Sequence, residues 1–363
     1  MKLSDLGFDS WFEDHTPALH RPARHIARVT TVDRDAWLVR DDHGEKPAEL
    51  AGKYRFSARS SIDMPCVGDW VTVQHHNNGS AAIIHDVFPR KTFLRRKRAG
   101  KTVDFQMIAA NIDLAFIVQS CHYDFNVRRL DRYLVMAADG RIEPIIVLSK
   151  TDLITPGELD ERAAAIRQAG ITVEILSLSN RSGAGVDDFR QRLSPGVTCC
   201  LLGSSGVGKT TLINRLLGRN AYGTKLVSAT GEGTHATTRR QLIVLDHGAM
   251  LIDTPGMREL GILSAGEGIT ESFADIRELA IDCRFSDCTH TREPGCAVLR
   301  SIERGVLSEE RHQSYLKLMK ESEYHEMSYV DKRKKDRAFG RFIKNAQKNQ
   351  DGKKSRGTEY GTG

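Results

Sequence analysis

The 363-residue sequence contains no apolar run that approaches the roughly 20 residues needed to span a bilayer. Its first segment, MKLSDLGFDSWFEDHTPALH, carries acidic side chains where a secretory signal would have an apolar stretch. The sequence also has no internal repeat. These absences exclude a membrane-spanning protein and a repeat architecture, and they predict a cytoplasmic protein with no membrane partner.

Cysteine is scarce, with seven residues in the whole chain. Cys283, Cys288 and Cys296 fall in one short window, whereas the other four are scattered. This distribution argues against a disulfide framework and favours reduced thiols with one metal site. The rest of the composition is ordinary, with 40% hydrophobic and 28% charged residues, which excludes a disordered chain. At roughly 100 to 200 residues per domain, the length predicts two or three domains.

Positive charge is concentrated in two segments. Residues 331–363 carry 11 Lys and Arg against four acids, so the rest of the chain is close to neutral. A second run, from Arg90 to Lys101, has seven basic residues and no acid. Both segments suggest a polyanionic partner, because neutralising phosphates releases counterions. The alternative is a solvated face and a solubilising tail, which is expected to be disordered.

Residues 23–92 read as five short strands with alternating apolar positions: HIARVTTV, AWLVRD, ELAGKYRF, DWVTVQH and AAIIHDVF. This pattern predicts a small all-β barrel such as an OB-fold, which commonly presents a nucleic-acid-binding face. A purely structural barrel is the alternative. Residues 1–22 are interpreted as an N-terminal extension, and residues 93–104 as a basic linker.

Residues 105–265 alternate buried apolar strands with helices, which predicts an α/β domain with a parallel sheet. Residues 266–330 contain helical stretches such as SEERHQSYLKLMKESEYHEM together with a Cys/His cluster. They are interpreted as a mostly helical metal-binding domain that precedes the basic tail.

The strongest local motif is a phosphate loop between an apolar strand and an amphipathic helix. Its glycines allow backbone N–H groups to converge on phosphates, Lys209 reaches the β and γ oxygens, and Thr210 can ligate magnesium. The nucleotide contacts predicted here are Gly203, Ser204, Ser205, Gly206, Val207, Gly208, Lys209, Thr210 and Thr211.

A second phosphate-sensing motif, Asp253-Thr254-Pro255-Gly256, follows the apolar strand AMLI. Asp253 is expected to hold magnesium through water, and the Gly256 amide to sense the γ-phosphate. Thr237 and Thr238 lie between the two motifs and are candidates for the threonine that contacts magnesium. Together these residues predict nucleotide hydrolysis.

Base recognition is assigned to Ser149-Lys150-Thr151-Asp152, after the strand PIIVL. The Asp152 carboxylate can accept hydrogen bonds from guanine N1–H and the N2 amine, a donor pair that adenine lacks. The usual motif begins with Asn, so Ser149 is expected to weaken the contacts from this loop to the base and to the phosphate loop. After the next strand, Ser177 begins the segment Ser177-Leu178-Ser179, where a backbone N–H could meet guanine O6.

These motifs stand in an unusual order, because the guanine motifs precede the phosphate loop. The domain is therefore circularly permuted, and the chain resembles the ribosome small-subunit-dependent GTPase A family over roughly residues 23–325. The resemblance implies a multidomain protein with an OB-fold, a permuted GTPase domain and a zinc domain. It also implies GTP and GDP binding, magnesium, and a small ribosomal subunit with its rRNA as partner.

The zinc domain of that plan matches Cys283-x4-Cys288-x-His290-x5-Cys296. Three thiolates and one imidazole suit a tetrahedral zinc site, and four protein ligands leave no open position, so the zinc is expected to be structural. Three incidental buried cysteines are the alternative.

The glutamine that positions water in many GTPases is absent, because Met257 follows Gly256. The segment Gly231–Thr238 resembles the family's switch pattern, in which a histidine is the proposed replacement. His235 is therefore the catalytic candidate, together with Lys209 and with Thr237 as the magnesium threonine; Thr238 is held in reserve. An exposed loop histidine is the alternative for His235.

The sequence is thus interpreted as a GTPase of late small-subunit maturation, stimulated by the subunit and acting as a monomer. Two other functions remain open. One is a permuted GTPase that acts on another RNA or translation complex. The other is a GTP-gated binding protein in which hydrolysis only resets occupancy.

Overall fold

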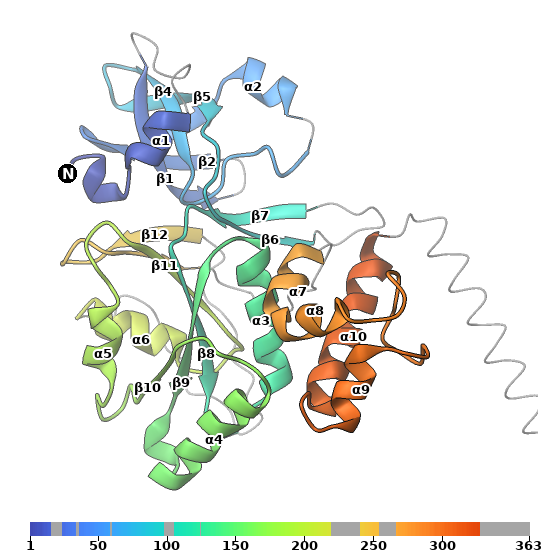
Figure 1. The fold of residues 1–363 in the computed structure, drawn as a ribbon. Helices are drawn as coiled ribbons and strands as arrows, with labels where there is room; N and C mark the ends of the chain where they lie inside the picture. The colour runs from blue at the N-terminus through green and yellow to red at the C-terminus, as the bar shows by residue number, and fades with distance from the viewer. Residues whose placement is uncertain are drawn as a thin grey trace, which may run out of the picture.

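The protein is described here from a computed structural model. It describes residues 1–15, 24–33, 36–58, 60–97, 105–123, 125–218, 240–253 and 266–326. A small β-barrel packs on an α/β layer, and a group of helices covers one side of that layer (Figure 1).

The barrel is closed by five strands, which confirms the predicted barrel: β1 (His25–Asp33), β2 (Ala36–Asp41), β3 (Gly44–Leu50), β4 (Trp70–His76) and β5 (Ala81–Val87). β1 pairs with both β2 and β4, and a parallel β3–β5 pairing completes the ring. Alternate side chains such as Val29, Val39, Val71 and Ile84 fill its interior, as the period of a strand requires.

The strand predicted over ELAGKYRF is wrong in its second half, because Gly52–Ser57 forms the short helix α2. Tyr54 and Phe56 imitate the alternation of a strand, but α2 buries none of its residues and Phe56 is 94% exposed. The chain therefore leaves the barrel after Leu50, where the buried alternation ends.

Residues 1–15, the described part of the segment interpreted as an N-terminal extension, pack into the junction between the barrel and the α/β layer. It forms a 3₁₀ turn, η1 (Ser4–Leu6), and the helix α1 (Ser10–His15). Leu6 and Phe12 are fully buried in the same cluster as Trp70. The buried guanidinium of Arg28 donates to the carbonyls of Leu6, Gly68 and Asn111, which ties three segments together. This part of the chain is thus a component of the core.

The α/β layer is one sheet whose strands are parallel except at one edge. Its order is β10 (Ile175–Leu178), β9 (Glu143–Ser149), β8 (Leu114–Ser120), β11 (Thr198–Leu202), β13 (Met250–Asp253) and β12 (Arg240–Val244). β12 is antiparallel to β13 and continues into the barrel through Thr31–Gln241 and Val32–Arg240 pairs with β1. The barrel is therefore attached through main-chain hydrogen bonds to the edge of the sheet.

Helices cover both faces of this sheet, as predicted for buried parallel strands. They are α3 (Val127–Asp139), α4 (Pro156–Gln168), α5 (Val186–Gln191) and α6 (Lys209–Leu216). Leu130 and Ile166 pack in one core cluster, while Phe189 and Leu212 pack in another. Successive residues of β8 alternate between the two clusters, because their side chains point to opposite faces of the sheet.

Part of the segment interpreted as a linker is a strand. β6 (Phe93–Lys97) pairs with β7 (Phe105–Ala110) in a two-stranded antiparallel sheet. The basic run from Arg90 to Lys101, which includes β6, is also partly neutralised within the fold. Among its described residues, Arg90 pairs with Asp69, Lys91 with Asp9 and Arg95 with Asp139. These three side chains meet acids that are distant in sequence, so the run offers less free positive charge than the sequence suggests.

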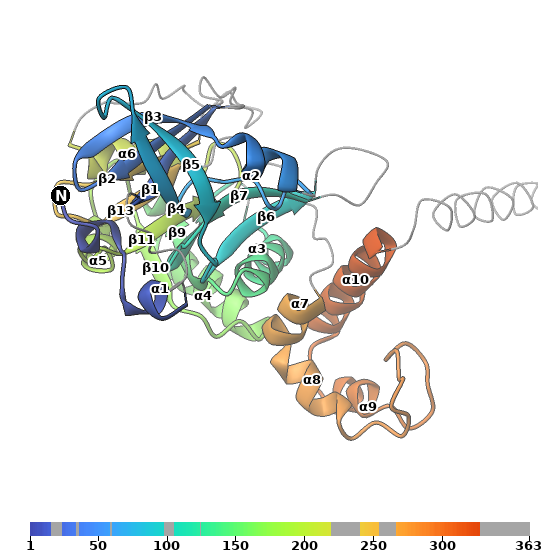
Figure 2. The same cartoon turned by 90° about the horizontal axis from the view of Figure 1, so that it is seen from above.

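The C-terminal helices are α7 (Gly266–Ser272), α8 (Ala274–Ala280), α9 (Ala297–Glu303) and α10 (Glu309–Glu326). α7 packs along α3 so closely that a Cβ on Gly268 would come within 2.5 Å of the Val135 carbonyl oxygen. Figure 2 shows α8, α9 and α10 on the side of α3 that faces away from the barrel. None of the helices described in the structure is long and apolar enough to cross a membrane. The predicted tail, residues 331–363, lies outside the described residues.

Candidate functional site

The phosphate loop joins β11 to α6, as predicted from the sequence. The Nζ of Lys209 donates to the carbonyl oxygens of Gly203 at 2.7 Å and Ser204 at 2.6 Å. These bonds close the loop around the ammonium group. Gly203 is required because its φ is +142° and a Cβ would lie 2.2 Å from the Val118 carbonyl oxygen. The loop thus holds a cation at the N-terminus of a helix, an arrangement suited to phosphate.

The loop after β9 is tied directly to the phosphate loop. The Ser149 hydroxyl is fully buried and donates to the Val207 carbonyl oxygen at 2.7 Å. A serine at this position therefore still reaches the phosphate loop, and the expectation that its contacts are weaker than those of Asn stays a prediction. Lys150 has a left-handed backbone with φ of +61°, and this turns the chain into the 3₁₀ helix η3 (Thr151–Leu153).

The carboxylate of Asp152 is held by a serine on the neighbouring strand end. Ser179 Oγ donates to Asp152 Oδ1 at 2.5 Å, and accepts the amides of Arg181 and Ser182 at 3.1 Å each. Asp152 is itself exposed, so its other acceptor positions face solvent. Ser177, the residue selected from the sequence, lies two positions earlier with an exposed side chain. The structure brings Ser179 to Asp152, and Ser177 does not contact it.

Asn180 is a site residue that the sequence reasoning missed. Its side-chain Nδ2 donates to the Gly208 carbonyl oxygen at 3.0 Å, and its main-chain carbonyl oxygen accepts from Arg215 Nη1 at 2.7 Å. Asn180 therefore joins the strand end beside Asp152 to the start of α6. The available signal was its position immediately after the serine that follows β10.

Asp253 ends β13 on the side of the sheet where Lys209 lies. Burial raises the pKa of Asp253, and the positive charge of Lys209 offsets part of that rise. Thr210 and Thr211 lie in the first turn of α6, half-buried and exposed respectively. The carboxylate and the phosphate loop thus share the carboxyl end of the sheet, where ligands bind in open α/β folds. Gly256, His235, Thr237 and Thr238 lie outside the described residues.

Four predicted metal ligands converge in the C-terminal helical region. The donor atoms of Cys283, Cys288, His290 and Cys296 lie within 4.8 Å of one another. Cys283 Sγ is 3.9 Å from Cys296 Sγ, and His290 Nδ1 is 3.6 Å and 3.4 Å from these two sulfurs. A tetrahedral zinc with bonds of about 2.3 Å to sulfur and 2.0 Å to nitrogen separates such pairs by about 3.8 Å and 3.5 Å. The cluster therefore has the dimensions of a zinc site.

Surrounding groups hold these ligands in place. The Ala297 amide donates to Cys283 Sγ at 3.3 Å. Burial alone would raise the pKa of the Cys283 thiol, but amide donors bring it below the ordinary value, which favours a thiolate. The ring of His312 donates to the His290 carbonyl oxygen at 2.8 Å. These contacts fix the backbone of the ligand loop against α9 and α10.

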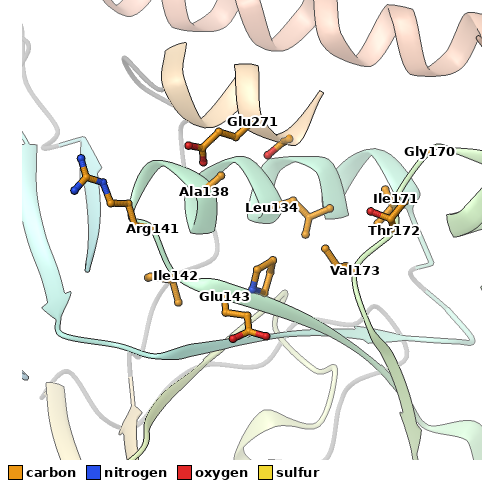
Figure 3. A pocket seen from close by; sticks show the side chains of 12 residues that line it. Leu134, Ala138, Arg141, Ile142, Glu143, Gly170, Ile171, Thr172, Val173 and Glu271 are labelled. Atoms are coloured by element: carbon orange, nitrogen blue, oxygen red, sulfur yellow. The ribbon is translucent and has the colours of Figure 1, made fainter. Parts of the chain in front are cut away.

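A separate cavity of about 430 Å³ lies between α3, α7 and the start of β9 (Figure 3). Leu134, Ala138, Glu143 and Glu271 are among its lining residues. Since β9 begins at Glu143, the cavity is at the amino end of the parallel strands, opposite the phosphate loop. It is therefore not the nucleotide site.

Comparison with known proteins identifies the family of this chain. A profile of the RsgA GTPase family matches residues 87–263. A "Small ribosomal subunit biogenesis GTPase RsgA 2" of Lactiplantibacillus plantarum is 42% identical, and the match covers 87% of this chain and 89% of that protein. A "Small ribosomal subunit biogenesis GTPase RsgA" of Opitutus terrae is 38% identical, over 89% of this chain and 90% of that protein.

Two solved structures have the same fold. The crystal structure of YjeQ from Thermotoga maritima aligns with a TM-score of 0.62 and 27% identity, over 82% of this chain and 98% of that one. The structure of YloQ, described as a circularly permuted GTPase, aligns with a TM-score of 0.60 and 24% identity, over 85% and 98%. With the motifs, their order and these matches together, the chain belongs to the RsgA GTPase family.

Proposed function

We propose that this protein hydrolyses GTP to GDP and phosphate during late maturation of the small ribosomal subunit, and that the subunit stimulates hydrolysis. The observation that carries the nucleotide chemistry is the Ser149–Val207 hydrogen bond. It joins the loop that bears Asp152 to the loop closed by Lys209, so that one ligand with both a guanine and phosphates can bridge them. The relatives' names support the ribosomal part of the proposal.

Magnesium is proposed to sit beside the phosphate loop. The Thr210 hydroxyl would be a direct ligand, and Asp253 would act through water. A divalent cation there would keep Asp253 ionised in spite of its burial, and it would neutralise charge on the phosphates. Thr237 is proposed as the second hydroxyl ligand, and His235 as the residue that orients the attacking water.

One structural zinc is proposed at Cys283, Cys288, His290 and Cys296, because the spacing of their donor atoms fits a closed tetrahedral site. The ion would hold the ligand loop against α9. We further propose that the protein is a cytoplasmic monomer that meets rRNA through its barrel and its basic tail.

A short segment of the chain connects the nucleotide site to the C-terminal helices, where the subunit could act. Only residues 254–265 separate Asp253 from α7, which begins the C-terminal helical region. A partner bound to that region can therefore act on the γ-phosphate side of the site through this short connection. Because Met257 cannot position water, turnover without a partner is expected to be slow.

The test is GTP turnover with and without purified small subunits, with large subunits as the matched control. We expect slow turnover alone, strong stimulation by small subunits only, and loss of stimulation in His235→Ala with GTP binding retained. Equal rates with both kinds of subunit would contradict the ribosomal proposal. Full stimulation of His235→Ala would remove only His235 from catalysis.

A further inference from the structure

The first turn of α3 faces the phosphate loop. Asn126 caps this helix, and its Oδ1 accepts from the Arg129 backbone amide at 3.2 Å. The cap fixes the backbone of Arg129 at the point where its half-buried side chain leaves the helix. From there Arg129 Nη1 donates to Ser204 Oγ at 2.7 Å. A charged donor thus reaches the second residue of the phosphate loop.

Ser204 connects this guanidinium to the phosphate-binding ammonium. While its side chain accepts from Arg129, its main-chain carbonyl oxygen accepts from Lys209 Nζ at 2.6 Å. A shift of Ser204 would therefore move one of the two carbonyl groups that orient Lys209. The position of Arg129 is in this way transmitted to Lys209 through one residue.

α3 is a firm support for such a contact, because other parts of the molecule hold it. The two terminal guanidinium nitrogens of Arg132, Nη1 and Nη2, pair with the carboxylate of Glu321 in α10, at 3.0 and 2.5 Å. At the end of α3, Asp139 accepts two bonds of 2.9 Å from Arg95 in β6. In both views α3 lies between the sheet and the C-terminal helices (Figure 1 and Figure 2).

We propose that Arg129 is a positioning residue for nucleotide binding, which holds Ser204 and thereby the carbonyl group that orients Lys209. This inference rests on the proposed GTPase function. Since the phosphate loop cradles the phosphates that GTP and GDP share, Arg129 affects the affinity for both nucleotides alike. We expect its effect to fall on binding more than on kcat, because Arg129 supports the loop that cradles the bound phosphates.

The first experiment compares Arg129→Ala with Arg128→Ala by calorimetric titration of GTP and GDP and by steady-state kinetics. Arg128 is an exposed neighbour in the same turn, so it controls for loss of one positive charge. We expect Arg129→Ala to raise both Kd values and the KM for GTP about tenfold, the effect of losing one charge-assisted hydrogen bond. Its kcat should change less than about threefold, and Arg128→Ala should resemble the wild type. A general loss of folded protein would lower kcat and leave KM unchanged.

The second experiment is a double-mutant cycle with Ser204→Ala. If Arg129 acts through Ser204, adding Arg129→Ala to Ser204→Ala should change the affinity by less than about twofold. The inference is overturned if Arg129→Ala matches Arg128→Ala, if its tenfold effect persists in the Ser204→Ala background, or if only GTP binding is weakened. Wild-type protein is assayed first, because a wild type without GTP hydrolysis would refute the proposed function and not the role of Arg129.

Discussion

Arg311 is the residue whose loss is expected to damage the junction between α10 and α3 most. Its guanidinium donates to Asp131 of α3 at 3.2 Å, to both carboxylate oxygens of Asp275 and to the Ser272 carbonyl oxygen. It also lies 3.9 Å from the ring centre of Phe273. The side chains of Arg311 and Asp131 are each only 4% exposed, so the pair is almost fully withdrawn from water.

Replacing Arg311 with Met keeps most of the apolar stem and removes the charge. Asp131 would keep one hydrogen bond, from Ser314 Oγ at 2.6 Å, but no buried cation. Removing one partner of a buried pair costs about 3–5 kcal/mol, because the other charge is left uncompensated. We therefore expect Arg311→Met to lower the free energy of unfolding by about that amount at pH 8.

The loss of stability caused by Arg311→Met should become smaller as the pH falls. Burial already raises the pKa of Asp131 in the wild type, and the Ser314 hydroxyl and Arg311 oppose that rise. Without Arg311 the pKa rises further, so the folded protein binds a proton that the unfolded chain releases. Lower pH then favours folding of the variant. The difference in free energy of unfolding between variant and wild type should therefore be smaller at pH 5 than at pH 8.

The assay is denaturant unfolding of Arg311→Met and wild type at both pH values, followed by circular dichroism. A second variant, Arg311→Met with Asp131→Asn, removes both charges and should recover part of the stability at pH 8. The reasoning is refuted if Arg311→Met costs less than about 1 kcal/mol, the range of an exposed pair. A loss equal at both pH values, with no recovery in the double variant, would also refute it.

Two further predictions concern the ligand sites. The Asp152→Asn variant should lose the preference for GTP over xanthosine triphosphate, because the new amide can donate to the C2 carbonyl of xanthine. Competition binding measures this preference, and an unchanged preference would remove Asp152 from base recognition. Cys296→Ser should lose the one zinc expected per chain, measured by metal analysis. Because a structural zinc contributes about 10–16 kcal/mol of apparent binding energy, the C-terminal helices should unfold; retained zinc would contradict the site.

The phosphate loop, the alternation of strands and helices and the four metal ligands could be predicted because their signals are local. The residue that contacts Asp152 at the base site could not be predicted from local signals. Ser177 and Ser179 both lie at the end of one strand, and the sequence does not separate them. The pairing of Leu178 with Ser149 across the sheet places the following residue, Ser179, level with the loop of Asp152. Only the register of two strands carries that information.

The basic run from Arg90 shows the same limit for charge. No acid lies within the run, so the sequence indicated a free cationic surface. In the fold, Arg90 meets Asp69 and Arg95 meets Asp139, 21 and 44 positions away in the sequence. Carboxylates that are distant in sequence take up part of this charge, and only the tertiary structure shows which arginines they reach.

Because Arg311 contacts α3, the Arg311→Met variant also tests whether nucleotide binding depends on the position of this helix. Asp131 lies two positions after Arg129, so the helix that Arg311 supports is the helix that reaches Ser204. If Arg311→Met only separates α10 from a rigid α3, the nucleotide affinity should stay at the wild-type value under conditions where the variant is folded. If α3 needs α10 to keep its place, the affinity should weaken in the manner of Arg129→Ala, for GTP and GDP alike. Nucleotide titration of the folded variant therefore separates a loss of stability from a displacement of α3.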